Sequence, residues 1–298
     1  MEIWLIATIA AAAVQTLRFM LQKRLKGIGL STGGATFSRF LFAVPLATLG
    51  VAVLVVWRGY EIPALGGVFW AFAIMGGIAQ IIATFCTVAL FSERSFAVGI
   101  AFTKTETVQV ALFSAVFLAE TVSGFGVLAI LIGLAGVLML SRPPEGWLAG
   151  KILNRATVLG LLAGAFFGLS AIGYRGATIE IANPDPLFRA MLALACVTAF
   201  QTVAMALWLR WREAGEVSKT LGAWRATLPV GVTGVLGSLG WFTAFALQNA
   251  AYVRSVGQIE LIFSILVSLF IFGEKPSKRE IAGMALLALS IILIVAVA

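Results

Sequence analysis

The chain of 298 residues contains no histidine, a single aspartate (Asp185) and two cysteines. Without histidine it can hold no His-containing catalytic triad and no HExxH zinc site, and one aspartate excludes an intramembrane aspartyl pair. Cys86 and Cys196 lie in separate apolar runs, which favours free thiols over a disulfide. There is also no Walker motif to bind ATP. We therefore expect no enzyme, no metal site and no cofactor.

Charge is scarce as well. Charged residues make up 11% of the chain, hydrophobic residues make up 61%, and the mean hydropathy is +1.04. A typical soluble domain is about one quarter charged. Because so much apolar surface can be hidden only in lipid, the composition predicts an integral membrane protein. The net charge of +8 comes from short turns between apolar runs, which favours a positive-inside bias over nucleic-acid binding.

Ten apolar runs follow one another along the chain, each of a length suited to a membrane-spanning helix of about 20 residues. They are Ile3–Leu21, Thr32–Trp57, Gly66–Phe91, Phe96–Ala119, Val122–Ser141, Thr157–Ile179, Pro186–Leu209, Trp224–Asn249, Val256–Gly273 and Ile281–Val297. The first run follows only Met1 and Glu2, without a positive charge, and is expected to be an uncleaved helix. The connections are short, so function has to be built within the helix bundle or at its mouths.

The two halves of the chain share a pattern. The segment TETVQVALFSAVFLAE at 105–120 aligns with IELIFSILVSLFIFGE at 259–274, with both glutamates and one serine in register. Small residues follow the second glutamate at equal spacing in each copy. They are Ala129 and Gly136 in the first copy, and Gly283 and Ser290 in the second. A further pair of matching residues is Arg39 with Arg189. These coincidences favour an internal duplication.

Five spans in each half have a geometric consequence, because an odd number inserts the second copy upside down. We therefore expect an all-α integral membrane protein with ten transmembrane helices in a 5+5 inverted repeat. Residues 1–141 would form the first repeat, 142–156 the connecting loop and 157–298 the second repeat. Such a plan is common in transporters and places the binding site near the midplane, between the repeats.

With these features the chain resembles the drug/metabolite transporter superfamily, and within it the EamA type with ten helices and two EamA-like repeats. The resemblance rests on the apolar helices ending in Ala119-Glu120 and Gly273-Glu274, and on the spaced small residues after them. Many members of the family carry Glu-Pro at the start of that motif. Here the positions read Glu106-Thr107 and Glu260-Leu261, and the missing prolines predict straighter helices.

Glu106 and Glu260 are the foremost candidates for a role in transport. Ionisable groups inside a span usually face a cavity or a partner, and matched positions of an inverted repeat approach the same axis. Each glutamate shares its helical face with small and polar residues, such as Ser114 for Glu106. Two interpretations stay open: binding of a substrate ammonium or a proton, or a structural ion pair with Lys104 or Arg18.

Further polar residues within the spans are candidates either for the substrate site or for contacts between helices. Together with Lys104 and Arg18 they are Gln15, Gln80, Tyr174, Trp241 and Gln258. Arg175 and Arg189 lie near run ends and are expected to snorkel. Glu120 and Glu274 share the family motif but lie where a helix starts, so we expect them to bind unpaired backbone N–H groups there.

The loop cations are unevenly divided between the two sides of the membrane. One side carries 13: Lys23, Arg24, Lys26, Arg94, Arg142, Lys151, Arg155, Arg210, Arg212, Lys219, Lys275, Lys278 and Arg279. The side of the termini carries Arg58 and Arg254, with Arg175 and Arg189 near it. The positive-inside rule therefore predicts that both termini lie outside. The family resemblance implies the opposite, with both termini in the cytoplasm.

The favoured function is a secondary transporter in the cytoplasmic (inner) membrane that moves a small polar metabolite, such as an amino acid, by alternating access. Export is the expected direction, and protons are a candidate coupling ion. The alternative is a flippase for a lipid-linked or amphiphilic substrate, which would need a lateral opening lined with polar residues. The expected partners are the substrate and the lipid bilayer, with a monomer favoured over a homodimer.

Overall fold

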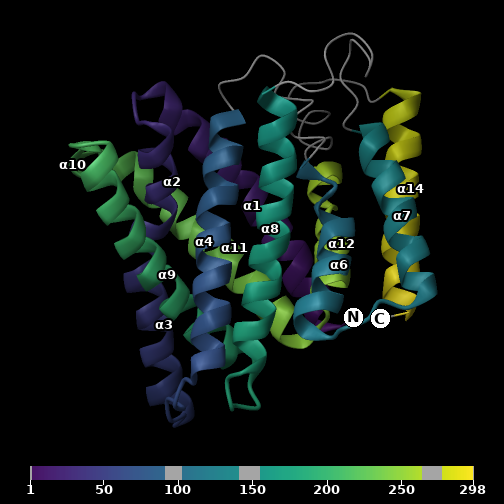
Figure 1. Cartoon of the computed structure of the whole chain (residues 1–298), viewed down its shortest axis with the longest axis horizontal. Coiled ribbons are helices and arrows are strands. Elements are labelled where there is room, and N and C mark those ends of the chain that lie inside the picture. Colours follow the sequence, from purple (N-terminus) through teal and green to yellow (C-terminus); the bar gives the residue numbers. More distant parts are fainter. Residues whose placement is uncertain (1, 91–102, 141–154, 264–276, 298) are drawn as a thin grey trace.

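The computed structural model describes residues 2–90, 103–140, 155–263 and 277–297, and within these ranges every regular element is an α-helix. Figure 1 shows the helices as one bundle. They are α1 (Ile3–Gly27), α2 (Thr32–Leu41), α3 (Ala43–Arg58), α4 (Gly67–Leu90), α6 (Glu106–Leu118), α7 (Gly124–Leu140), α8 (Arg155–Ile179), α9 (Pro186–Arg212), α10 (Glu216–Gly222), α11 (Trp224–Leu247), α12 (Ala250–Gly257) and α14 (Lys278–Val297).

Seven of the described helical stretches are long and apolar enough to cross a membrane, where the sequence predicts ten spans. One of the seven, Thr32–Arg58, consists of α2 and α3, which meet at Phe42. α6 and α7 are shorter apolar helices, and parts of the fourth and ninth predicted runs lie outside the described residues. The boundaries of the other long helices follow the predicted runs to within about three residues, except that α1 continues from the predicted end at Leu21 to Gly27.

Local sequence explains where several helices begin and end. The Ser31 side chain accepts a hydrogen bond from the Gly34 N–H at the start of α2, and Asp185 accepts bonds from two N–H groups at the start of α9. Pro186 follows Asp185 as the first residue of α9, where its missing N–H has no consequence. α3 ends at Gly59, whose φ of 66° lies in the left-handed region that glycine tolerates.

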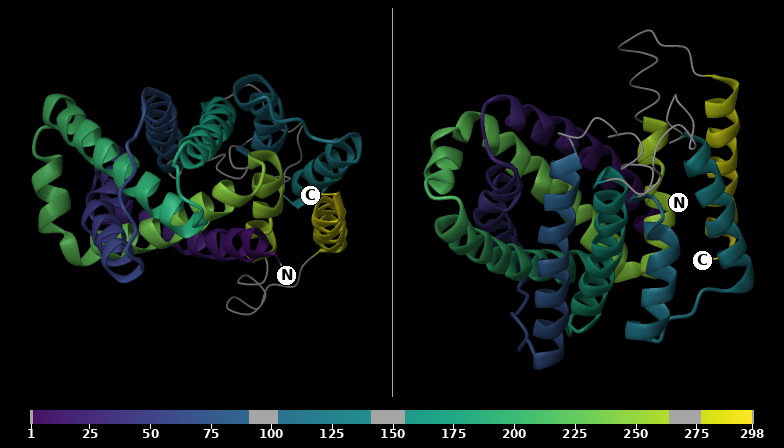
Figure 2. Two further views of the ribbon diagram at one scale, coloured as in Figure 1. Left: turned by 90° about the horizontal axis from the view of Figure 1, so that it is seen from below. Right: turned by 45° about the horizontal axis from the view of Figure 1, so that its top comes forward.

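Most of the close packing joins a helix of the first half to a helix of the second. α1 runs along α11, α4 along α8, α3 against α9, α6 against α12 and α7 against α14. α7 and α14 form a pair at one end of the bundle and α3 and α9 lie at the other, as the views in Figures 1 and 2 agree. Both termini lie on the same side of the bundle (Figure 1).

Small residues allow these close contacts. A Cβ added to Gly173 of α8 would lie 2.5 Å from the Cα of Gly76 in α4, so the two backbones touch. In the α7–α14 pair a Cβ on Gly136 would lie 2.8 Å from the carbonyl oxygen of Gly283. The Ser290 hydroxyl donates to the Ala129 carbonyl, 2.7 Å away. The equally spaced small residues of the two sequence copies therefore pack against one another.

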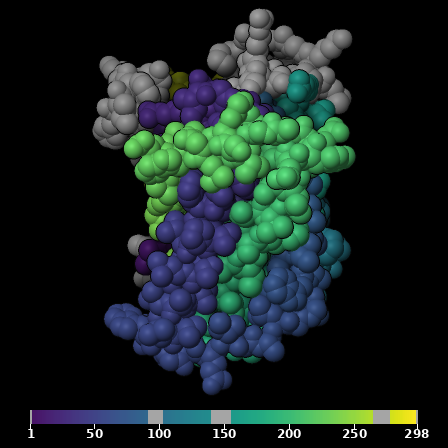
Figure 3. Space-filling view, turned by 90° about the vertical axis from the view of Figure 1, so that its left-hand side faces the viewer, coloured from purple at the N-terminus to yellow at the C-terminus, as the bar shows by residue number. Residues whose placement is uncertain are grey.

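On the side of the bundle away from the termini, α10 and the end of α9 lie across α2. Figure 3 shows this as a green band over the purple-blue residues of α2. The carboxylate of Glu213 accepts a hydrogen bond from the Ser31 hydroxyl, and that of Glu216 accepts one from the Ser31 N–H at 3.0 Å. Burial alone would raise the pKa of Glu216, but hydrogen bonds from Lys219 and Ser31 outweigh it and lower that pKa.

Two spans are interrupted at matching positions, which corrects the expectation of straight helices. Lys104 and Thr105 form a turn just before Glu106, and Gln258 and Ile259 form the same turn just before Glu260. These turns form without proline. At them, hydrogen bonds from an N–H to the carbonyl three residues earlier replace the bonds to the carbonyl four residues earlier that a regular α-helix makes. Examples are Val108 N–H to Thr105 O (3.2 Å) and Ile259 N–H to Val256 O (3.1 Å).

Candidate substrate site

A small polar cavity lies in the middle of the bundle, between helices of both halves. The first half contributes Gln15, Arg39 and Gln80, and the second contributes Phe167, Ser170, Ala171, Tyr174, Ser238, Trp241, Phe242, Phe245 and Arg254. The space open to the centre of a water molecule is about 20 Å³, enough for a water or two. Binding of a metabolite here therefore requires the helices to move apart.

Arg39, from the end of α2, is the fully buried cation on the cavity wall. Its guanidinium donates to the hydroxyl of Thr84 at 2.9 Å and to that of Ser238 at 3.4 Å. With the amide of Gln80 oriented to satisfy its neighbours, the amide oxygen accepts from both guanidinium nitrogens at 2.6 and 2.9 Å, and the nitrogen donates to Ser170. All these partners are neutral, and within the described residues Arg39 forms no ion pair.

Four charged residues form two ion pairs beside the cavity, at the two interrupted helices. Lys104 pairs with Glu260, and Arg254 pairs with Glu106. Each pair joins the first half of the chain to the second. Their side chains are 4–12% exposed, so the pairs are shielded from water. The structure thus confirms a cross-half partner for Lys104 and supplies one for Glu106 that the sequence analysis did not name.

A hydrogen-bonded chain connects the ion pairs to the aromatic part of the cavity. The Gln15 amide nitrogen donates to Glu260 at 3.0 Å, and the Trp241 indole N–H donates to the Gln15 amide oxygen at 3.1 Å. The guanidinium of Arg254 lies 4.5 Å from the centre of a Trp241 ring, within cation–π range. A Cβ on Gly257 would come within 2.4 Å of the same indole, so only glycine leaves room for it.

Arg18 of α1 lies close to Arg39, next to Gly234 of α11. A Cβ on Gly234 would be 3.3 Å from Cγ of Arg39 and 3.9 Å from Cδ of Arg18. Arg18 is 2% exposed; its Nη1 donates to Gln22 at 2.7 Å and its guanidinium stacks on Phe19 at 4.4 Å. Its Nη2 is buried and has no hydrogen-bond partner within the described residues. Arg18 therefore does not pair with either glutamate.

Two other residues predicted for the site, Tyr174 and Gln258, lie on the cavity wall and at a helix break respectively. Tyr174 stacks on Phe242 with ring centres 4.2 Å apart and accepts a hydrogen bond from Gln201 at 3.2 Å. Gln258 lies in the turn before Glu260, where its amide nitrogen donates to the Arg254 carbonyl at 3.3 Å. Gln258 is thus part of the helix break rather than of the cavity wall.

Arg254 lies on the cavity wall, where the sequence predicts a loop residue. It was assigned to the loop before the ninth run, but the structure places it in α12, facing Glu106 and the cavity. A signal for the earlier helix start was present. Asn249 precedes Ala250 and accepts a hydrogen bond from the Ala251 N–H, as a helix-capping residue does.

Glu120 has a different partner from the backbone N–H groups predicted for it. Its carboxylate pairs with the guanidinium of Arg175 at 2.8 Å, and Ser123 takes the capping position before α7 by accepting from the Gly126 N–H. Arg175 also donates to the carbonyl of Phe245 at the end of α11. The equivalent residue, Glu274, lies outside the described residues.

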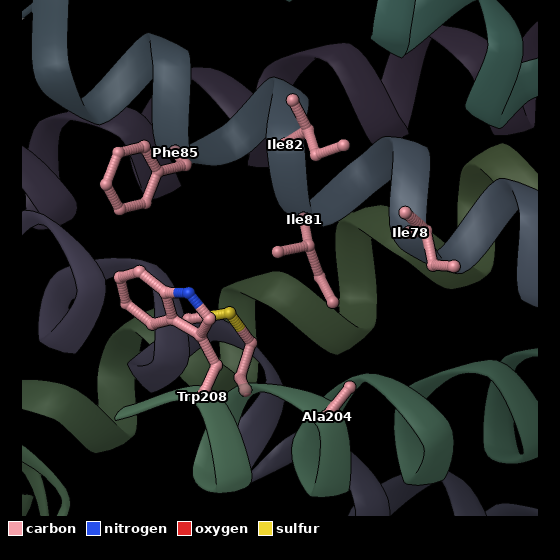
Figure 4. A pocket seen from close by; sticks show the side chains of 7 residues that line it. Ile78, Ile81, Ile82, Phe85, Ala204 and Trp208 are labelled. Atoms are coloured by element: carbon pink, nitrogen blue, oxygen red, sulfur yellow. The ribbon is translucent and has the colours of Figure 1, made fainter. Parts of the chain in front are cut away.

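A larger cavity lies on the outer surface between α4 and α9, shown close up in Figure 4. Its volume is about 360 Å³, and its walls are Ile78, Ile81, Ile82, Phe85, Ala204, Met205 and Trp208. Every side chain that lines it is apolar apart from the indole N–H of Trp208. None of its lining residues is shared with the polar cavity. It lacks the polar walls that a passage for a lipid headgroup would need.

The structure thus combines apolar helices of membrane-spanning length with a charged cavity between the two halves of the chain. Residues 154–296, the second half of the chain, match the model of the EamA-like transporter family. The pseudopaline exporters CntI of two strains of Pseudomonas aeruginosa, PAO1 and UCBPP-PA14, are each 26% identical to it over 183 residues. That stretch covers 61% of this chain, and the chain spans 60% of the length of these relatives.

The fold has a counterpart among solved structures. A crystal structure at 16% sequence identity covers 97% of this chain and 99% of its own, with a TM-score of 0.65. At that level of identity the likeness concerns the fold alone.

Proposed function

We propose that this chain is a secondary transporter of a small polar metabolite, with amino acids and related compounds as the substrate class and export as the direction. The observation that carries the proposal is the central cavity, which polar and charged side chains from both halves line. A cavity of this kind binds solutes by placing a few polar groups among aromatic walls.

Alternating access around an inverted 5+5 repeat is the proposed mechanism, and the packing of α7 with α14 supports it. Ala129 contacts Ser290 and Gly136 contacts Gly283, while Ala129 corresponds to Gly283 and Gly136 to Ser290 in the sequence repeat. When residue i contacts residue j and their counterparts exchange roles, the two elements are related by a two-fold axis. Rocking about such an axis would expose the cavity to each side in turn.

The two ion pairs fit this mechanism as closures between the halves. Lys104–Glu260 and Arg254–Glu106 each span the boundary that rocking has to open. We propose that a substrate amine competes for a glutamate and a substrate carboxylate for a cation, so that binding loosens the cross-half pairs. A proton binding to either glutamate would act in the same way, which makes both residues candidates for coupling.

Cysteine accessibility tests alternating access directly. Cys86 and Cys196 are both free and would be replaced by alanine before Ser238→Cys is introduced on the cavity wall. We expect a membrane-impermeant thiol reagent to modify the new cysteine from either side of sealed vesicles. Leu236→Cys, two residues away on the exposed face of α11, is the matched control and should not gain two-sided labelling. Labelling of Ser238→Cys from only one side would contradict the mechanism.

Transport is measured with purified protein in liposomes loaded with labelled amino acids. We expect efflux above that of protein-free liposomes, and a lower flux for the Glu260→Gln variant. If no solute in a broad metabolite panel moves although the protein is folded, the proposed function is wrong. The apolar lining of the outer cavity favours this proposal over a flippase, and the same liposomes carrying labelled lipid would reveal lipid flipping.

We propose from the distribution of the cations that both termini lie outside the cytoplasm. The burial of Arg254 removes one cation from the side of the termini and so strengthens the bias that places both termini outside. A C-terminal reporter that is active only in the periplasm should therefore be active. A signal from a cytoplasmic reporter at that position would reverse the assignment.

A further inference from the structure

The buried charges in the middle of the bundle do not balance. Among the described residues, four cations lie there, Arg18, Arg39, Lys104 and Arg254, against two carboxylates, Glu106 and Glu260. Lys104 and Arg254 are paired with those carboxylates. Arg18 and Arg39 are both at most 5% exposed, and neither contacts a carboxylate within the described residues.

This surplus cannot be relieved by loss of a proton. An arginine side chain stays protonated in proteins, unlike a buried lysine or glutamate, which can become neutral. Two permanent positive charges inside a lipid-embedded bundle are costly unless an anion accompanies them. Within the described residues Arg39 has only neutral hydrogen-bond partners, namely Gln80, Thr84 and Ser238, and Nη2 of Arg18 has none.

The two arginines also lie close together and form a single site. A Cβ on Gly234 would lie within 4 Å of both side chains, so the two arginines are neighbours at that glycine. Arg39 reaches the cavity wall, whereas Arg18 lies behind it, with one nitrogen held by Gln22. Guanidinium groups recognise carboxylates through a planar pair of N–H donors, and Arg18 still has such a donor unused.

From this we infer that the transported substrate is a small metabolite with at least two carboxylates, one bound by Arg39 in the cavity and one by Arg18. The inference rests on the proposed transport function and narrows its substrate class. An amino acid with a neutral side chain would balance only one of the two charges. A dicarboxylate balances both, and any amine on it finds Glu106 and Glu260 nearby.

Matched ligand pairs test the charge requirement on the unaltered protein. The probes are succinate with its monoamide succinamate, and glutamate with glutamine, each pair differing by one carboxylate. Binding is followed by the shift in unfolding temperature of the detergent-solubilised chain. We expect each dicarboxylate to bind at least tenfold more tightly than its partner. Equal binding within both pairs, or no binding of either dicarboxylate, would overturn the inference.

Inorganic phosphate and chloride identify other anions as the ligand. If phosphate alone stabilises the protein, the site is a phosphate site and the dicarboxylate assignment is wrong. If chloride does so to the same extent as succinate, the arginines hold an inorganic counter-ion and the assignment is again wrong. Stabilisation by the dicarboxylates well beyond both supports it.

Variants then assign the two arginines. Arg39→Gln and Arg18→Gln should each weaken dicarboxylate binding tenfold or more, and Arg39→Lys should recover part of it, since it keeps the charge but loses the planar fork. Arg212→Gln is the control, because Arg212 is exposed at the end of α9 and stacks on Trp211. Unchanged dicarboxylate binding in both arginine variants would overturn the inference. Flux of neutral amino acids in liposomes, by contrast, would leave the proposed transport function standing.

Discussion

Two groups of buried charges lie side by side in this bundle and differ in one respect. At the interrupted helices, Lys104 and Arg254 each have a carboxylate within the protein. Around Gly234, Arg18 and Arg39 have none within the described residues. Both groups are largely removed from water, and the main difference between them is charge balance. The paired group stabilises the contact between the halves, whereas the unpaired group suits a ligand from outside the protein.

The largest effect is expected from breaking a pair in the balanced group. Glu106→Gln leaves Arg254 buried without a counter-charge, which should lower the stability by about 3–5 kcal/mol. Thermal unfolding in detergent measures it. The double variant Glu106→Gln, Arg254→Gln is the control and should regain most of the loss, because no lone charge remains. If the single variant is as stable as the double one, the pair is not balanced in the way described.

A packing variant provides a reference loss of stability that involves no change of charge. Gly173→Val adds side-chain atoms where α8 touches the backbone of α4, at a Cβ distance of 2.5 Å from Gly76. Overpacking of this kind should cost about 1–3 kcal/mol. Gly222→Val, at a position with open space around it, is the matched control and should lose less. Equal unfolding temperatures for the two variants would argue against the tight α4–α8 contact.

Removal of a charge from the unbalanced group, Arg18 and Arg39, should not lower the stability as breaking a balanced pair does. Arg18→Met removes a buried charge without leaving another one unpaired, so the stability should stay within about 1 kcal/mol of the unaltered protein or rise. The same unfolding assay measures it. A loss as large as that of Glu106→Gln would mean that Arg18 has a counter-charge inside the protein and that the comparison fails.

The smallest effect is expected for a pair at the edge of the bundle. The Lys219 side chain is 63% exposed, so its ion pair with Glu216 is screened by water. Lys219→Met should cost at most about 1 kcal/mol. The pKa of Glu216 is lowered, so its contribution is present above the ordinary glutamate pKa and declines as the pH falls through the lowered value. Stability scans from neutral to acidic pH, with Glu216→Gln as reference, would detect this decline.

Much of the fold could be predicted from hydrophobic runs, because lipid demands a minimum length of apolar helix. The predicted start of α9 at Pro186 and of α11 at Trp224 agree with the structure. The small residues of the repeat favoured a duplication, and in the structure they form the close contact between α7 and α14. The helix breaks could not be found in this way, since neither contains proline and a two-residue turn hardly changes the hydropathy.

The partners of the charged residues were harder to foresee than their positions. Glu106, Glu260 and Lys104 were recognised because a charge inside an apolar run is rare. Which cation meets which carboxylate depends on how helices cross, and spacing along the chain does not encode that. Arg254 shows a related difficulty. A charge just before an apolar run predicts a loop residue, whereas the structure places Arg254 inside α12.

The contact of Gly76 with Gly173 has a consequence for movement. Where two helices interlock through large side chains, a shift of one along the other forces each side chain out of its rotamer. Here the backbones of α4 and α8 touch at two glycines, but the ring of Phe72 in α4 lies against Gly176 and that of Tyr174 in α8 lies against Gly76. Ala11 and Gly240 likewise bring α1 and α11 close together. Both long contacts between the halves are thus built on small residues, and the rings of Phe72 and Tyr174 are the groups that a relative movement of α4 and α8 would have to displace.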